Sequence, residues 1–144
     1  MATEHTWFFW AVLSAVFAAL TAVFAKVGLD GVNSDLATLI RTAVIIVVLS
    51  LFVIGTGQWS NPGEIPARSW LFLVLSALAT GASWVCYFRA LKVGEASRVA
   101  PVDKLSVILV ALFAVAFLGE RPQPREWLGI LLVGAGVALM ALRR

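Results

Sequence analysis

The sequence predicts an all-α integral membrane protein, and two observations predict it: an apolar composition and a series of long apolar runs. Hydrophobic residues make up 61% of the chain and charged residues 13%, and the mean hydropathy is +0.96. Soluble domains contain about 45–50% apolar and about 25% charged residues. A water-soluble fold has too little interior for this much apolar surface, so the lipid bilayer is the expected solvent.

Five apolar runs are long enough to cross a bilayer, which takes about 20 mostly apolar residues. Short polar or Gly/Pro-containing breaks separate them. The five expected transmembrane helices are Trp7–Val27, Leu36–Ile54, Ser69–Phe88, Ser97–Leu118 and Pro124–Leu142. Asp35 is the expected N-cap of the second helix, and residues 89–96 are the expected loop before the fourth. The whole chain, residues 1–144, is expected to form a single domain.

Charge and tryptophan together predict the orientation of the chain. Most Lys and Arg residues lie on the side that carries the C-terminus, and such basic regions face the cytoplasm. Five of the six tryptophans lie toward the other side, as in an interfacial belt. We expect the N-terminus outside and the C-terminus inside a bacterial or archaeal inner membrane. Lys26, Arg41 and Lys104 lie within or at the ends of helices. If they are set aside, five basic residues remain on the predicted cytoplasmic side and three on the other, so dual topology stays open.

The residues present argue against several classes of function. A single cysteine, Cys86, and a single histidine exclude an intrachain disulfide and the usual zinc sites. The sequence contains no Ser-His-Asp or Cys-His set and no Gly-rich phosphate loop, so we expect no enzyme activity, no metal and no cofactor. The net charge of +3 comes from residues that flank apolar runs, which indicates contact with lipid headgroups rather than nucleic acid.

Charged residues within the helices are the first candidates for function, because each costs at least ~2.5–3.5 kcal/mol to insert. Asp103 and Lys104 follow Pro101, which is expected in the first turn of the fourth helix, and lie about 10 Å along that helix. Arg41, on a polar face of the second helix, needs an anion: Asp35, Asp103 or a substrate carboxylate or phosphate. The structural alternative is that Lys104 snorkels to the headgroups while Asp103 pairs with a nearby basic residue.

Hydroxyl and aromatic residues share one face of the third helix. The hydroxyl residues are Ser76, Thr80, Ser83 and Tyr87, at spacings of four, three and four. Trp84 flanks them, and such a mixture is typical of a pocket for a small polar ligand. Hydrogen bonding between helices is the alternative explanation. A weaker polar stripe on the first helix ends at Lys26.

Three segments in order carry a resemblance to a known family. They are FAKVGLDGVNSDLATLIRT (24–42), SWVCYFRALKVGEASRVAPVDKLS (83–106) and FLGERPQPREWLGILLVGAGVAL (117–139). Together they resemble the drug/metabolite transporter superfamily, and specifically its EamA-type domain in the single-domain bacterial and archaeal form. The resemblance covers nearly the whole chain. It implies one half of an inverted-repeat transporter, whose second half is flipped because each half has an odd number of spans.

The resemblance implies a secondary transporter, working as an exporter by alternating access, but it does not specify a substrate. From the residues themselves, Lys104 and Arg41 are expected to attract a small anionic or zwitterionic metabolite. Because one half cannot enclose the cavity, the resemblance implies a dimer surrounded by lipid, with an antiparallel homodimer favoured and a parallel homodimer or an unlike partner left open. In relatives the first, third and fourth helices line the cavity. The expected substrate-binding residues are Lys104, Arg41, Trp84, Tyr87, Ser83 and Thr80, and the expected ion-pair or proton-relay residues are Asp103, Asp35 and Lys26. The alternative is a non-transporting membrane subunit that binds a lipid-linked intermediate or a partner complex.

Overall fold

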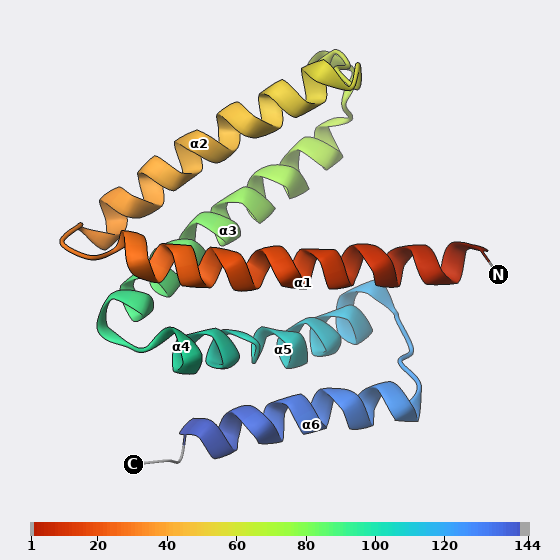
Figure 1. The fold of residues 1–144 in the computed structure, drawn as a ribbon. Helices are drawn as coiled ribbons and strands as arrows, with labels where there is room; N and C mark the ends of the chain where they lie inside the picture. Colours follow the sequence, from red (N-terminus) through yellow and green to blue (C-terminus); the bar gives the residue numbers. More distant parts are fainter. Residues whose placement is uncertain (1, 142–144) are drawn as a thin grey trace. The chain divides into compact units, whose positions relative to one another are not determined.

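The computed structural model describes the backbone of residues 2–141 and the side chains of residues 6–140. Over these residues the chain is helical and contains no strand (Figure 1). The α-helices are α1 (Ala2–Gly28), α2 (Ser34–Gly55), α3 (Ala67–Val93), α4 (Ala96–Asp103), α5 (Ser106–Phe113) and α6 (Pro124–Ala141). A short 3₁₀-helix, η1 (Pro62–Glu64), precedes α3, and a π-helical turn, η2 (Ala114–Leu118), ends α5. The predicted all-α fold class is confirmed.

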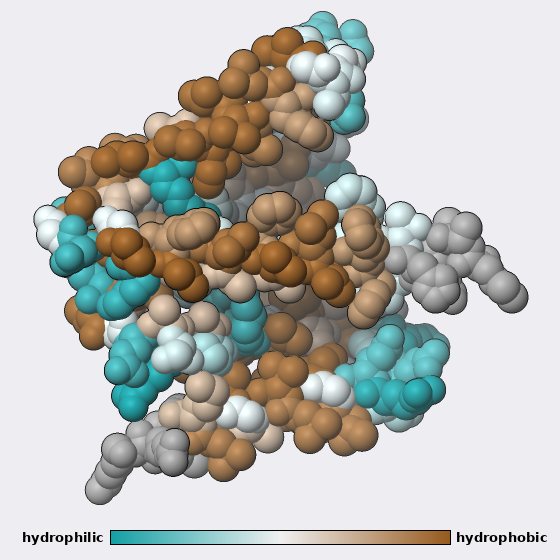
Figure 2. Space-filling model, in the orientation of Figure 1, coloured by the Kyte–Doolittle hydropathy of each residue, from teal (hydrophilic) through white to brown (hydrophobic). Residues whose placement is uncertain are grey.

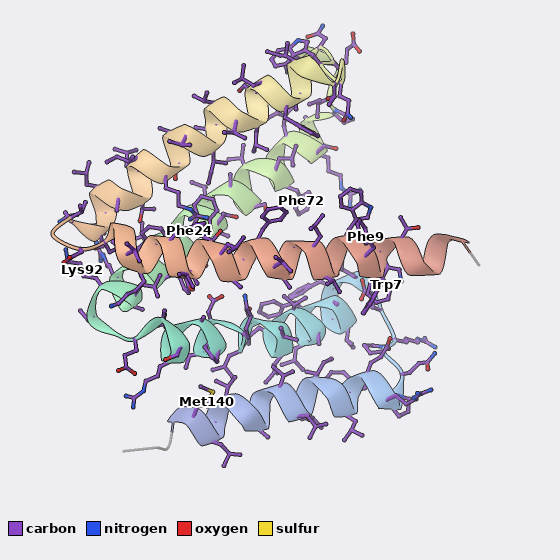
Figure 3. The ribbon with its side chains drawn as sticks, in the orientation of Figure 1. Trp7, Phe9, Phe24, Phe72, Lys92 and Met140 are labelled. Atoms are coloured by element: carbon purple, nitrogen blue, oxygen red, sulfur yellow. The ribbon has the colours of Figure 1, made fainter. Side chains whose placement is uncertain are left out.

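Four stretches of the described residues are long and apolar enough to cross a membrane. They are Thr6–Gly28, Ser34–Gly55, Ala67–Val93 and Ala96–Leu118. The fifth expected span corresponds to α6, which is described over 18 residues, and its expected end, Leu142, lies outside the described residues. Hydrophobic residues cover much of the helical surface in Figure 2, and Trp7 and Phe9, labelled in Figure 3, are more than half exposed. Lipid covers such a surface, and the protein is a multi-pass membrane protein.

The first unit, residues 1–93, is compact by itself. Within it α3 contacts both α1 and α2, and Figure 1 shows α2 and α3 side by side as an antiparallel hairpin. Its buried side chains include Ala22, Leu29, Phe88 and Leu91, of which Leu91 is fully buried. The core of this unit therefore lies where the last turns of α3 meet the end of α1 and the loop that follows it.

The start of α2 differs from the prediction. Asn33, and not Asp35, is the N-cap: its Oδ1 accepts hydrogen bonds from the N–H groups of Asp35, at 2.9 Å, and Leu36, at 3.2 Å. The prediction for Asp35 is wrong because the Asn33 side chain already satisfies the free N–H groups of the first turn. Asp35 lies inside that turn, where the helix dipole favours a negative charge, and its carboxylate is available for another partner.

The end of α3 also differs from the prediction. The loop expected at residues 89–96 is wrong over most of its length, because α3 continues to Val93 and α4 begins at Ala96. Arg, Ala, Leu and Lys at 89–92 are all strong helix formers, and the first helix-breaking residue is Gly94. The added turn brings Arg89 and Lys92 onto α3 as side chains that can reach the neighbouring helices.

The second unit, residues 94–144, is compact by itself, and in its described part α6 contacts both α4 and α5. Gly134 of α6 lies against α5: a Cβ atom added there would come within 2.5 Å of the Cδ1 atom of Ile108. The absence of a side chain at Gly134 therefore lets these two helices approach closely, as small residues do in membrane proteins.

The expected fourth helix, Ser97–Leu118, is interrupted in the middle. Helix α4 ends at Asp103 and α5 starts at Ser106. Pro101 is the sixth residue of α4 and lies beyond its first turn, so its predicted place in the first turn is wrong. A proline at this position has no N–H for the carbonyl of Ser97. Just beyond it the winding tightens, because the N–H of Lys104 donates to the carbonyl of Pro101 at 3.0 Å.

Candidate functional site

The guanidinium of Arg41 lies over two aromatic rings of α3. Its Cζ atom is 4.0 Å from the centroid of the Trp84 ring and 5.4 Å from that of Phe88. The two rings share one face of α3 because they are four residues apart. Cation–π contacts of this kind contribute about 0.5–2 kcal/mol. They compensate part of the cost of holding a charge in an apolar helix.

A pocket of about 420 Å³ lies beside this guanidinium in the first unit. Its walls come from α1, from the loop after α1, from α2 and from Phe88 of α3, and they are mostly apolar. Arg41 is the one charged residue among those that line it, and Thr21 adds a hydroxyl. A mostly apolar pocket of this size with few polar groups is typical of a site for a small molecule.

None of the three ion pairs formed by the described side chains includes Arg41. Asp35 binds Arg89 instead, through two hydrogen bonds of 2.9 Å and 2.7 Å between the guanidinium and the carboxylate. Asp103 binds Lys104, with 3.3 Å between Oδ2 and Nζ. Both carboxylates that were predicted as partners of Arg41 therefore pair with other basic residues. A substrate anion as the partner of Arg41 stays a prediction.

Basic residues near the pocket connect α3 to the end of α1 and to the loop that follows it. The Nζ atom of Lys26 donates to the carbonyl of Leu91 at 2.6 Å. The Nζ atom of Lys92, labelled in Figure 3, donates to the carbonyl of Val32 in the loop between α1 and α2. Carbonyls in the last turn of a helix lack intrahelical donors, so Lys26 satisfies one of them. With the Arg89 pair to Asp35, these contacts hold one end of the first unit together.

The expected hydroxyl stripe on α3 bonds partly to its own helix. The Thr80 hydroxyl donates to the carbonyl of Ser76 at 2.8 Å, and Ser83 is exposed. Tyr87 is half-buried, and its ring lies 6.5 Å from that of Phe88. The structure places the ring of Trp84, a residue expected on this face, against the Arg41 guanidinium.

Asp103 and Lys104 lie where α4 ends, in the second unit. They form an ion pair with each other, and both are exposed. Their position at the interruption between α4 and α5 was not predicted, because the sequence indicated one continuous helix. A role for them in substrate binding stays a prediction.

Two residues at the site were not predicted from the sequence. Phe88 was taken only as the end of a helix, and Arg89 only as a loop charge. The four-residue spacing of Trp84 and Phe88 was a usable signal for a shared aromatic face. No spacing rule predicts the pairing of Arg89 with Asp35, because 54 residues separate them.

Comparison with known proteins agrees with a membrane protein of the transporter type. The sequence model of the EamA-like transporter family matches residues 5–142. An uncharacterized transporter in the cobO 3′ region of Sinorhizobium sp is 62% identical over 139 residues, which are 96% of this chain and 99% of the relative. The uncharacterized transporter YxxF of Bacillus subtilis (strain 168) is 25% identical over 136 residues, which are 94% of this chain but 42% of the relative.

A third relative is named as part of a lipid flippase. The probable 4-amino-4-deoxy-L-arabinose-phosphoundecaprenol flippase subunit ArnE of Pseudomonas fluorescens (strain Pf0-1) is 34% identical over 84 residues, which are 58% of this chain and 68% of the relative. No solved structure matches the chain. The family match spans nearly every residue, and the 62% identity extends along almost the whole of the Sinorhizobium relative. The chain belongs to the EamA-like transporter family.

Proposed function

We propose that the chain is a secondary transporter for a small metabolite that carries a carboxylate or phosphate group. Family membership and the transporter names of two relatives support transport in general. The anionic character of the substrate is inferred from one observation: Arg41 forms no ion pair with the described side chains. The proposed direction is export by alternating access.

Arg41 is the main support for this proposal, because the described side chains place two aromatic rings, and no carboxylate, against its charge. Its guanidinium has five N–H donors, and among the described residues none of them makes a hydrogen bond or an ion pair, while two rings support the charge from α3. A guanidinium recognises a carboxylate or phosphate through two parallel hydrogen bonds. An anionic group entering the 420 Å³ pocket supplies that partner.

The proposed working unit is a dimer, with an antiparallel homodimer favoured. The chain covers 42% of the Bacillus relative, which fits two copies taking the place of one longer chain. With an odd number of spans, two copies in opposite orientations reproduce an inverted repeat. Labelling of each terminus from one side of the membrane only would indicate a parallel homodimer, and co-purification of a second subunit would indicate an unlike partner. The proposed location is the inner membrane, where one copy of an antiparallel dimer has its C-terminus in the cytoplasm and the other copy has it outside.

A ligand screen on the purified protein tests the role of Arg41. We expect carboxylate- or phosphate-bearing metabolites to raise the thermal unfolding temperature and their uncharged analogues to leave it unchanged. In Arg41→Gln the affinity for the best ligand is expected to fall about 10-fold to 100-fold, since a hydrogen-bonded charge contact contributes about 1.5–3 kcal/mol. Arg98→Gln is the matched control, because Arg98 is exposed and pairs with Glu95 at 3.3 Å.

Two results would count against the proposal. Equal affinity in Arg41→Gln and the wild type would remove Arg41 from the site. Co-purification of a stoichiometric unlike subunit, without flux by the chain alone, would favour the non-transporting membrane subunit, a role compatible with the name of the flippase-subunit relative. Lys104→Gln tests separately whether the second unit contributes to binding.

A further inference from the structure

The second unit contains a pocket of about 430 Å³ that shares no residue with the Arg41 pocket. Its apolar wall is formed by α5, η2 and α6, where Val110, Ala114 and Ile130 line it. Its polar part is formed by three charged residues of the connection into α6 and its first turn: Glu120, Arg121 and Glu126. The pocket therefore combines an apolar slot with charges of both signs.

The π-helical turn η2 builds the polar part of this pocket. The carbonyl of Ala114 accepts from the N–H groups of both Gly119 and Glu120, and Gly119 has a left-handed φ of 68°, which glycine adopts without strain. The chain reverses there, so Glu120 lies at the same pocket as Ala114. A carboxylate oxygen of Glu126 accepts from the N–H of Gln123 at 2.6 Å, which fixes its side chain at the start of α6.

The charges at this pocket do not neutralise one another. In the described part of the second unit the ion pairs are Glu95 with Arg98 and Asp103 with Lys104. Glu120, Arg121 and Glu126 form none among the described side chains, although two of them are adjacent in the sequence. One guanidinium and two carboxylates thus remain able to bind opposite charges on one ligand.

The polar end of the pocket is expected at the depth of the lipid headgroups. The spanning stretch Ala96–Leu118 ends directly before Gly119, so the residues that follow enter the membrane surface region. In Figure 2 hydrophilic residues gather over the connection between η2 and α6, next to the hydrophobic surface of α6. An apolar slot that runs from this depth along the helices matches the position of a phospholipid acyl chain.

We propose that this pocket binds a phospholipid with a primary ammonium headgroup, phosphatidylethanolamine. Its phosphate binds Arg121, because a guanidinium suits phosphate oxygens. Its ammonium group donates hydrogen bonds to the carboxylates of Glu120 and Glu126. One acyl chain fills the apolar slot beside Val110 and Ala114. The quaternary ammonium of phosphatidylcholine has no N–H to donate, and phosphatidylglycerol has no ammonium group, so both bind more weakly.

Native mass spectrometry of the intact, delipidated protein with each of these three lipids tests the proposal. We expect phosphatidylethanolamine to be retained about fivefold more strongly than phosphatidylcholine, and this preference to disappear in Glu120→Gln. In Arg121→Gln the retention of both lipids is expected to fall, because both carry the phosphate group. Arg125→Gln is the matched control, because Arg125 is an exposed residue in the first turn of α6 that does not line the pocket. Val110→Trp fills the slot without changing a charge, and it is expected to lower retention of phosphatidylethanolamine at an unchanged circular dichroism spectrum.

Equal retention of phosphatidylethanolamine and phosphatidylcholine by the wild type would overturn the proposal. So would an equal loss in Arg125→Gln and Arg121→Gln, which would indicate general attraction of lipid to the surface. If the pocket variants changed the oligomer distribution and left lipid retention unaltered, the pocket would be an interface between copies of the chain instead.

Discussion

Arg41 shows how a permanent charge is accommodated in an apolar helix without a carboxylate from the described protein. The rings of Trp84 and Phe88 supply the compensation at 4.0 Å and 5.4 Å. Because rings accept no strong N–H hydrogen bonds, the guanidinium keeps its ability to bind an anion. At Asp35 the outcome is the opposite, since its carboxylate is fully engaged by Arg89.

Replacement of the closer ring tests this compensation. In Trp84→Leu we expect the affinity for the anionic ligand to fall about three- to tenfold, because the lost cation–π contact no longer orients the guanidinium. Trp59→Leu is the control, since Trp59 is an exposed loop residue. Thermal-shift titration measures both. Unchanged affinity in Trp84→Leu would mean that the ring does not position Arg41.

A double-mutant cycle tests the pair of Asp35 and Arg89. Each single variant, Asp35→Asn and Arg89→Gln, is expected to unfold at a lower temperature than the wild type in detergent. The double variant is expected to be no less stable than the weaker single variant, because the two changes remove the same contact. Strictly additive losses would show that the two side chains do not interact in the folded protein.

The site was only partly predictable from the sequence, for reasons visible at individual residues. Arg41 and Trp84 were identified because a charge and an aromatic stripe stand out in apolar helices. Their mutual contact was not predicted, since it depends on how α2 and α3 pack. Asp35 was predicted to form an ion pair, but its partner followed only from the extra turn of α3, which carries Arg89. The charges at Glu120 and Arg121 reach their pocket through a π-helical turn that no sequence pattern indicated.

At the scale of elements, the positions of the helices were predictable and some of their ends were not. The hydrocarbon core demands about 20 apolar residues per span, and this length was sufficient to locate each span along the sequence. The end of α3 was missed because charged residues at 89–92 indicated a loop, although their helix propensity is high. The interruption between α4 and α5 was missed because Pro101 was expected in the first turn, whereas it lies inside α4.

The contact between α5 and α6 yields a prediction with a control in the same helix. In Gly134→Val the added side chain meets Ile108 of α5, and we expect a loss of about 1–3 kcal/mol in the free energy of unfolding from overpacking. Gly136→Val is expected to have a much smaller effect, since a Cβ atom there has no neighbour within 4 Å. Reversible unfolding in mixed micelles measures the difference. Equal losses in the two variants would contradict this packing.

At the scale of the whole molecule, the protein is a multi-pass membrane protein of the EamA-like family that exposes most of its apolar side chains. A core built from few buried residues is sufficient because lipid, rather than protein, surrounds the rest of the helical surface. The same surface offers room for a second copy. The single-domain organisation over residues 1–144 stays a prediction from the sequence.

The proposed dimer predicts a measurable mass and a measurable orientation. Light scattering of the detergent-solubilised protein is expected to give a protein mass of twice 15.5 kDa. With Cys86→Ala as background, single cysteines placed near each terminus are expected to be labelled from both sides of the membrane if the copies are antiparallel. A mass of one chain would contradict the dimer, and labelling of each terminus from one side only would favour a parallel arrangement.

Flux through the purified protein tests the central proposal most directly. Proteoliposomes loaded with the best anionic ligand from the screen are expected to release it with the wild type and with Arg98→Gln at the same rate, and at least about tenfold more slowly with Arg41→Gln. Equal rates for Arg41→Gln and the wild type would contradict the role of Arg41 as the anion-binding residue, and no flux with any version of the chain alone would contradict the proposed transport.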